Sequence, residues 1–273
     1  MTGSTLPIGL FDSGIGGLSV AQQVLRLMPR ENSVYFGDTA RVPYGSKSSE
    51  TVIEYSLQAA RLLESIGVKM IIIACNTASA VALEQVRSIA SVPVIGVIQP
   101  GAGAALEATR NGRVGVIGTE GTIRSGAYQG ALLSAAPELH IAARACPLFV
   151  GFAEEGLSDH PATILMARDY LAPLLRESID TLIMGCTHYP ILAPSIELVS
   201  GDQVTLINPG VATAIEAQRV LASLDLLNDS DARPRHEYYL SDLPHKFVEV
   251  GERFLGQPLE QVYRISLDEL AGG

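Results

Sequence analysis

The sequence predicts an α/β protein of two similar domains, each a mainly parallel sheet flanked by helices, related by a pseudo-two-fold axis with the active site between them. Of its 273 residues, 47% are hydrophobic and 26 are glycine, a composition typical of sheets buried on both faces. Short apolar runs alternate with segments of helical period. The order of strand, turn, helix, strand and cysteine also occurs twice.

Continuous apolar runs predict the strands, because a parallel strand is covered by helices on both faces and needs no polar side. Glycine, proline or polar residues bound each run. The expected strands are Ile8–Phe11, Val34–Phe36, Met70–Ala74, Val94–Val97, Val114–Ile117, Thr181–Met184, Leu206–Ile207 and His236–Leu240.

Apolar residues at intervals of three or four positions predict the helices between these strands. The longest, Ser49–Ile66, places Val52, Ile53, Leu57 and Leu62 on one face. The other expected helices are Leu18–Leu27, Thr77–Ile89, a segment from Pro100-Gly101 to about Arg110, Ile164–Leu175, Val211–Leu224 and Lys246–Leu255. The polar stretch 226–235 predicts a loop.

Two pairs of segments indicate an internal duplication. Ile8–Leu27 resembles Val114–Leu133, and Met70–Ala80 resembles Thr181–Pro190, roughly 110 residues later. We therefore expect a first domain of residues 1–98 plus 210–273 and a second of residues 99–209, since the C-terminal tail is too short to form its own core. A chain that merely repeats strand and helix units is the alternative.

Charge and composition exclude several classes of protein. The net charge is −10 and no basic cluster is interleaved with aromatics, so nucleic acid is not expected as the main partner. Residues 1–7 do not resemble a secretory signal, and no apolar run approaches the roughly 20 residues of a membrane helix. We expect a cytoplasmic protein. Three cysteines without CxxC or HExxH spacing favour neither a disulfide framework nor a metal site.

Polar residues follow several predicted strands, where ligands bind in open α/β sheets. Asp12, Asp38, Cys75, Thr119 and Cys186 all occupy such positions. If the two halves face each other, the two cysteines approach a ligand from opposite sides.

The residues after each cysteine separate packing from chemistry. Cys146 precedes a proline and is expected to pack as a small hydrophobe. Cys75 instead precedes Asn76-Thr77, and Cys186 precedes Thr187-His188. In an apolar core the polar groups of these neighbours would each need a hydrogen-bond partner, which favours chemistry over packing for both cysteines.

A free thiol ionises near a pKa of about 8.5, so it can hold or release a proton near neutrality. A thiolate that takes a proton from one face of a carbon, opposed by a thiol that protonates the other face, inverts a stereocentre without a cofactor. The alternative is one cysteine acting as a nucleophile with His188.

The segment Asp12-Ser13-Gly14-Ile15-Gly16-Gly17 is a glycine-rich turn from strand to helix, but it does not match the dinucleotide pattern GxGxxG. Backbone N–H groups and Ser13 at this helix start could hold a carboxylate. Asn76, Thr77 and Thr187 could do the same, with ordinary N-capping as the alternative for each.

Together these segments closely resemble the glutamate racemases, in order and spacing, over nearly the whole chain. The segments are Asp12–Leu18, Gly37-Asp38 followed by Pro43-Tyr44-Gly45, Ala74–Ala78 and Gly185–Pro190. The resemblance implies interconversion of L- and D-glutamate with neither pyridoxal phosphate nor metal, and a supply of D-glutamate for peptidoglycan. It also implies a homodimer.

The resemblance further implies roles for individual residues. Cys75 would take the α-proton of D-glutamate and Cys186 that of L-glutamate, assisted by Asp12 and His188 respectively. Glu154 matches an acidic residue near the second cysteine, although Gly151-Phe152-Ala153 stands where the family more usually has Pro-Leu-Val. The implied substrate contacts are Asp12, Ser13, Tyr44, Gly45, Asn76, Thr77, Thr119, Thr122, Thr187 and His188.

Three other interpretations stay open at this point. A related two-cysteine racemase or isomerase could act on aspartate, hydantoins or maleate, although Thr187-His188 favours glutamate. The protein could instead bind a small molecule between two similar lobes without catalysis, but binding alone would not require the two thiols. A regulatory protein that docks through an acidic surface has no motif in its favour.

Overall fold

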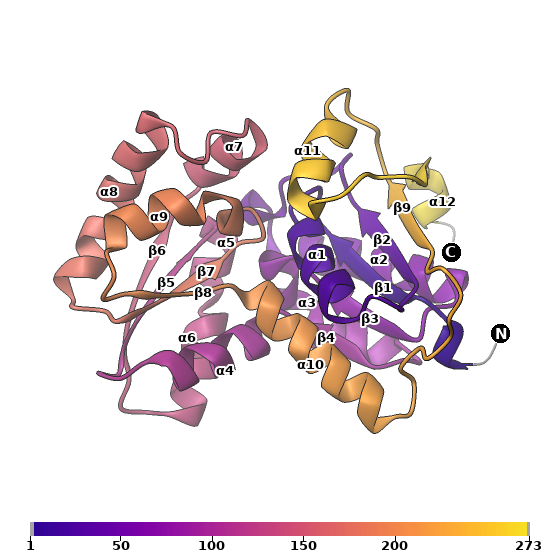
Figure 1. Ribbon diagram of the computed structural model, residues 1–273, viewed down its shortest axis with the longest axis horizontal. Helices are drawn as coiled ribbons and strands as arrows, with labels where there is room; N and C mark the ends of the chain where they lie inside the picture. The colour runs from indigo at the N-terminus through magenta and orange to yellow at the C-terminus, as the bar shows by residue number, and fades with distance from the viewer. Residues whose placement is uncertain (1–2, 272–273) are drawn as a thin grey trace.

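The computed structural model describes residues 3–271 and contains two parallel sheets that lie side by side (Figure 1). The strand order of the first sheet is β10 (Val262–Arg264), β9 (His236–Leu240), β2 (Ser33–Gly37), β1 (Ile8–Asp12), β3 (Met70–Ile73) and β4 (Val94–Gly96). That of the second is β6 (His140–Ala145), β5 (Arg113–Gly118), β7 (Thr181–Gly185) and β8 (Thr205–Ile207). All of these pairings are parallel. The predicted fold of two parallel sheets flanked by helices is confirmed.

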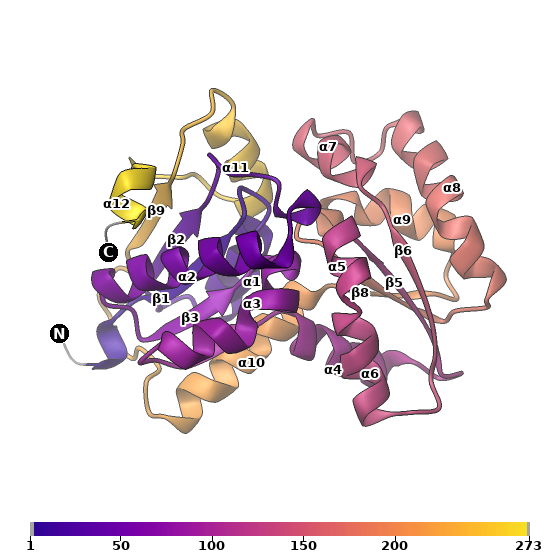
Figure 2. The ribbon, with the colours of Figure 1, turned by 180° about the vertical axis from the view of Figure 1, so that it is seen from behind.

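Helices cover both faces of the first sheet. Figure 1 shows α1 (Leu18–Leu27), α10 (Pro209–Ser223) and α11 (Phe247–Leu255) on the near face. Figure 2 shows α2 (Ser49–Ile66) and α3 (Asn76–Ile89) on the opposite face, and the short α12 (Leu267–Ala271) packs against α2. This double coverage explains why β1, β2 and β3 are buried along their whole length.

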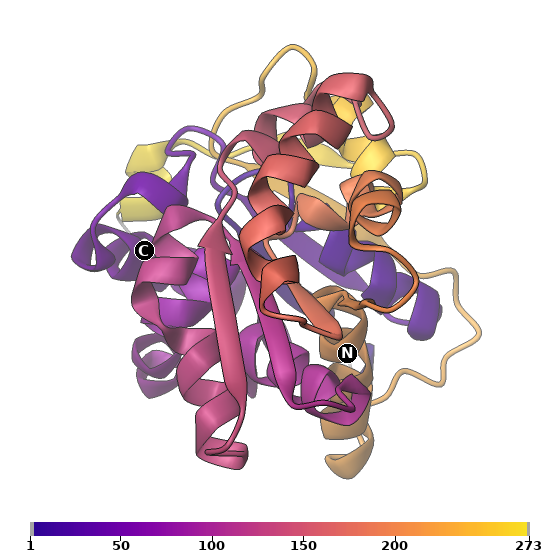
Figure 3. The ribbon, with the colours of Figure 1, turned by 90° about the vertical axis from the view of Figure 1, so that its left-hand side faces the viewer.

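Helices also flank the second sheet on two sides (Figure 3). One core joins β5 and β7 to α4 (Ile98–Ala108) and α6 (Ala127–Ala135), with α5 (Glu120–Ser125) beside them. The other core lies under α7 (Leu148–Glu154), α8 (Pro161–Arg176) and α9 (Ala193–Ser200). Single turns of 3₁₀ helix occur at Gly3–Thr5, Tyr44–Ser46 and Tyr189–Leu192.

The chain passes between the two sheets twice. It leaves β4 through α4 to reach β5, and it returns from β8 through α10 to reach β9; α4 and α10 pack against each other. The linker after α10 is fixed by a buried ion pair between Lys69 and Glu31, 2.5 Å apart. Lys69 Nζ also donates to the carbonyl of Leu226 at 2.7 Å, and Glu31 Oε1 accepts from the backbone N–H of Asn228 at 2.8 Å.

Three local features differ from the sequence-based expectation. Helix α4 begins at Ile98 rather than after Pro100-Gly101. Proline fits in a first helical turn because backbone N–H groups there have no partner within the helix, so the N–H that proline lacks costs no hydrogen bond. The segment Val114–Leu133, which resembles the strand, turn and helix of Ile8–Leu27, contains two helices, α5 and α6, that meet at Gly126, whose φ is +66°. Strands β6 and β10 and helices α7, α9 and α12 were not expected. Within residues 3–271, no helix has the length and apolarity to cross a membrane.

Candidate active site

A cavity of about 460 Å³ lies between the two sheets, at the carboxyl ends of β1, β3, β5 and β7. Both Cys75 and Cys186 line it, Cys75 from the end of β3 in the first sheet and Cys186 from the end of β7 in the second. A larger hollow of about 700 Å³ near residues 232–236 and 257–261 contains neither cysteine. The residues that line the cysteine cavity are Ser13, Val42, Pro43, Tyr44, Gly45, Ser46, Cys75, Asn76, Thr77, Thr119, Glu120, Pro147, Val150, Gly151, Cys186, Thr187 and His188.

Cys75 is placed by the junction of β3 and α3. It is the N-cap of α3, and its sulfur accepts the backbone N–H of Ala78 at 3.5 Å. The thiol also contacts the Ser13 hydroxyl at 3.7 Å. Burial, and then the nearby charge of Asp12, raise the pKa of Cys75 to about 12. Without a ligand this cysteine is therefore a protonated thiol at neutral pH.

Asp12 ends β1 beneath the glycine-rich turn and is 1% exposed. Its Oδ2 accepts the backbone N–H of Gly14 at 3.0 Å, whereas among the described residues Oδ1 has no hydrogen-bond partner. Burial raises the pKa of Asp12, against the opposing effects of the His188 charge and of backbone N–H groups. A buried oxygen without a partner is a ready acceptor for a proton or a hydrogen bond.

Cys186 follows β7 and is the first member of a chain of three contacting side chains, Cys186, His188 and Glu154, which we call the relay. Its sulfur lies 3.7 Å from His188 Nδ1, and His188 Nε2 lies 3.0 Å from Glu154 Oε1 on α7. Burial opposes the charge of His188, but hydrogen bonds to Cys186 and Glu154 outweigh it and raise the pKa of the imidazole to about 10. A protonated imidazole places a positive charge and an N–H donor beside the sulfur of Cys186.

The glycine-rich turn brings the two halves together. A Cβ at Gly16 would lie 2.4 Å from the His188 ring and from Thr187 Oγ1, so only glycine fits there. The Ser19 hydroxyl donates to the carbonyl of Thr187 at 2.7 Å. The turn therefore supports the Cys186 segment. Of the polar residues of the turn, Ser13 lines the cavity.

Further hydrogen bonds join the two sides of the cavity. Thr77 on α3 contacts Thr119, the N-cap of α5, at 2.9 Å between hydroxyl oxygens. The Tyr128 hydroxyl on α6 donates to Asn76 Oδ1 at 2.7 Å. The cavity walls thus form one hydrogen-bonded unit.

Most of the predicted site residues line the cavity, and three do not. Asp12 lies under its turn, Glu154 lies behind His188, and Thr122 is 1% exposed behind Thr119, to whose hydroxyl its own is hydrogen-bonded at 3.0 Å. These three contact residues that line the cavity or its turn rather than lining it themselves.

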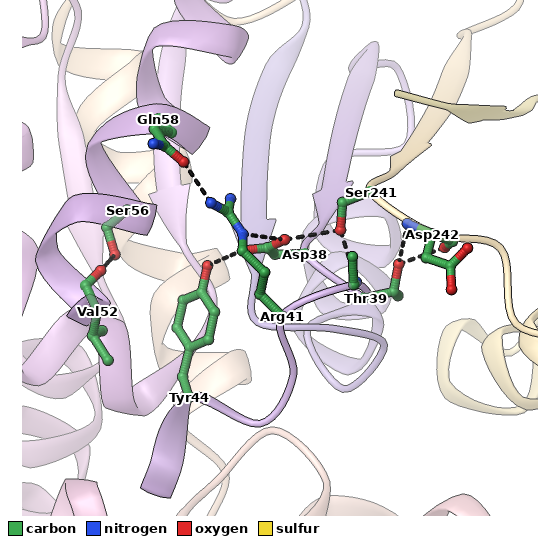
Figure 4. Close-up of polar contacts among 10 residues, drawn as sticks. Asp38, Thr39, Arg41, Tyr44, Val52, Ser56, Gln58, Ser241 and Asp242 are labelled. Atoms are coloured by element: carbon green, nitrogen blue, oxygen red, sulfur yellow. Dashed lines mark hydrogen bonds and ion pairs between the residues drawn. The ribbon is translucent and has the colours of Figure 1, made fainter. Parts of the chain in front are cut away.

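An Asp38 network, which the sequence did not indicate, holds the 42–46 wall of the cavity (Figure 4). Asp38 is fully buried; its carboxylate accepts from Arg41 Nε at 2.8 and 3.0 Å, from the Tyr44 hydroxyl at 2.5 Å and from the Ser241 hydroxyl at 2.8 Å. Tyr44 is thereby fixed with its ring in the core. The Arg41 contact at i, i+3 was a possible signal for this network, but nothing in the sequence connects Asp38 to Ser241.

Comparisons with known proteins agree with this geometry. The family model described as Asp/Glu/Hydantoin racemase matches residues 9–217. A glutamate racemase of Geobacter metallireducens is 49% identical over 96% of this chain and 97% of its own. The crystal structure of glutamate racemase from Francisella tularensis in complex with D-glutamate has a TM-score of 0.91 at 40% identity, covering 97% of this chain and 99% of that one. The Thermus thermophilus glutamate racemase in complex with beta-chloro-D-alanine has a TM-score of 0.88 at 43% identity, covering 97% and 99%.

Proposed function

Because the chain belongs to the Asp/Glu/Hydantoin racemase family, we propose that it interconverts L- and D-glutamate by a two-base mechanism in the cavity between its sheets. It is an amino-acid racemase, and hence an isomerase. The observation that supports the mechanism is that Cys75 and Cys186, which follow strands of different sheets, line one cavity. Two opposed thiol groups allow one to take the proton from one face of a carbon while the other delivers its own proton to the opposite face.

In the proposed reaction from L- to D-glutamate, the Cys186 thiolate takes the α-proton and the electron pair of the C–H bond stays on carbon. The Cys75 thiol then gives its proton to the opposite face, which leaves Cys75 as thiolate and Cys186 as thiol, the arrangement needed for D-glutamate. The charged His188 lies beside Cys186 and can donate a hydrogen bond to its sulfur, while burial keeps Cys75 protonated. Asp12 would assist Cys75, and Glu154 would orient His188.

The α-proton is far less acidic than a thiol, so the carbanion-like transition state needs preorganised donors in a site shielded from water. Helix α3 begins beside Cys75, and its first N–H groups have no partner within the helix. The side chains proposed to bind the substrate with them are those of Ser13, Asn76, Thr77, Thr119 and Thr187, together with the backbone at Tyr44 and Gly45. Among the described lining residues there is no lysine or arginine, so neutral donors would hold the carboxylates.

The primary test is circular dichroism of L- and D-glutamate incubated with the purified protein without added cofactor. We expect each enantiomer to lose its signal to zero, since enantiomers have equal free energy. Aspartate in a parallel reaction tests the nearest alternative substrate. No change with either glutamate enantiomer would refute the proposal.

The two-base mechanism has its own test in heavy water. Product D-glutamate should carry deuterium from Cys75, while unreacted L-glutamate keeps its protium during the first turnovers. Replacing either catalytic cysteine with serine should nearly abolish racemisation, and equally in both directions, because the equilibrium constant fixes the ratio of the two kcat/KM values. Cys146→Ser is the matched control, since Cys146 is fully buried and does not line the cavity. Retained activity in both single variants of the catalytic pair would exclude this mechanism.

In the cell, we propose that this activity supplies D-glutamate for peptidoglycan from a cytoplasmic homodimer. The family resemblance supports each of these assignments. Rescue of a D-glutamate auxotroph by the intact gene, but not by Cys75→Ser, tests the metabolic role. Light scattering after gel filtration tests the dimer.

A further inference from the structure

Helix α11 belongs to the first half and also contacts the Cys186 half. It lies opposite α7 in Figure 1. Phe254 of α11 is 1% exposed, and its ring meets the His188 ring edge to face, with centroids 5.2 Å apart at 76°. This contact limits the orientations open to the imidazole.

The neighbouring residue on α11 fixes the other end of the relay. Arg253 Nη1 donates to the backbone carbonyl of Glu154 at 2.9 Å. The guanidinium lies against Gly156, whose φ is +70° and where a Cβ would come within 2.7 Å of Arg253 Nη1. Arg253 therefore holds the C-terminal end of α7, from which the Glu154 carboxylate contacts His188.

We propose that Arg253 and Phe254 of α11 are positioning residues for the Glu154–His188–Cys186 relay, so that the first half of the molecule sets the proton-transfer geometry of the second. The kinetic part of this inference rests on the proposed racemase function. Neither residue lines the cavity, so their effect would pass through His188 rather than through substrate binding.

A second contact between the same helices provides a matched control. Lys246 lies immediately before α11 and pairs with Glu155 beside α7 at 3.2 Å, with both side chains more than half exposed. Neither of them contacts His188 or Cys186 in any described hydrogen bond or ion pair. Loss of this pair removes a link between the two halves and leaves the relay intact.

The test compares Arg253→Met, which keeps the long apolar stem but has no donor, with Arg253→Lys, Phe254→Leu and Lys246→Met. For Arg253→Met we expect kcat to fall about 10-fold, the equivalent of one hydrogen bond, with KM within about twofold of wild type. Lysine should restore part of the loss because it can still donate. Lys246→Met should match wild type.

A readout without substrate is the NMR titration of the His188 imidazole, assigned by comparison with His188→Asn. Charged groups facing this ring come from α7 (Glu154), from the end of β1 (Asp12) and from Cys186 itself. If Arg253 holds Glu154 in place, the His188 titration midpoint should fall in Arg253→Met and not in Lys246→Met.

Unchanged kcat and an unchanged His188 titration in Arg253→Met would overturn the proposal, as would equal losses in Lys246→Met. If Arg253→Met does not fold, Gly156→Ala displaces the guanidinium by another route. Its control is Gly126→Ala, where φ is +66° and nothing lies within 4 Å of the new Cβ. A wild-type protein that does not racemise glutamate would remove the proposed function, while the His188 titration would still decide the role of α11.

Discussion

Replacing Tyr128 with phenylalanine tests whether Asn76 is held as a hydrogen-bond donor to the substrate. Tyr128 is fully buried on α6, and its hydroxyl donates to Asn76 Oδ1 at the start of α3, across the boundary between the two halves. Because this bond occupies the amide oxygen, Nδ2 is free to donate into the cavity that Asn76 lines.

The structure sets the size of the effect. Tyr128→Phe leaves a buried acceptor without its partner, which costs about 1–3 kcal/mol of unfolding free energy. It also lets the amide rotate, so that its oxygen can face a carboxylate. Losing one hydrogen bond to a charged group removes about 1.5–3 kcal/mol, or about 10- to 100-fold in kcat/KM.

Tyr189→Phe is the matched control. Tyr189 is also fully buried, and its hydroxyl donates to the Cys146 carbonyl at 2.8 Å within the second half. Urea denaturation should show similar losses of stability in both variants, whereas polarimetry should show the large kinetic loss only in Tyr128→Phe. Equal kinetic losses, or full activity in Tyr128→Phe, would refute the reasoning.

Three further predictions concern the turn, the relay and the linker. Gly16→Ala should abolish activity with little change in far-UV circular dichroism, because its Cβ would lie 2.4 Å from the His188 ring; Gly130→Ala, in a helix with open space, should keep full activity. The pKa of His188 is raised from 6.5 to about 10, so the stability that its charged form contributes should be complete below about pH 6.5, decline as pH rises and be lost above about pH 10. Denaturation of wild type and His188→Asn across this range should show their difference in stability shrink, and a constant difference would contradict this expectation. Lys69→Met should cost about 3–5 kcal/mol in chemical denaturation, because it leaves the buried Glu31 carboxylate without its partner, and a loss below 1 kcal/mol would exclude that account.

The central strands were predictable because strands that are buried on both faces consist of continuous apolar residues. β1, β3 and β7 are covered on both faces, and Asp12, Cys75 and Cys186, at or just after their ends, mark the carboxyl edges of the two sheets. β6 was missed because it lies at the edge of its sheet and is only half buried, with three alanines and Ile141 as its one β-branched residue. The break at Gly126 was missed because a glycine inside an apolar helical pattern does not by itself show a positive φ.

The two cysteines and their polar neighbours were predictable for the same reason, since strand ends converge whatever the details of packing. The supporting contacts were not predictable. Tyr128 and Asn76 are 52 positions apart, and Arg253 and Glu154 are 99 apart. No local periodicity relates such pairs, because tertiary packing alone brings them together.

The strand order of the first sheet also has a consequence for biosynthesis. The second sheet uses one continuous stretch, β5 to β8, and has all its strands once Ile207 has left the ribosome. The first sheet, although it begins the chain, needs β9 and β10 and so lacks an edge until Arg264 is made. Phe254, which packs on His188, lies between β9 and β10 in the chain. A ribosome-bound chain truncated before α11 would thus contain both cysteines and still lack the contact of Phe254 with His188 and that of Arg253 with Glu154.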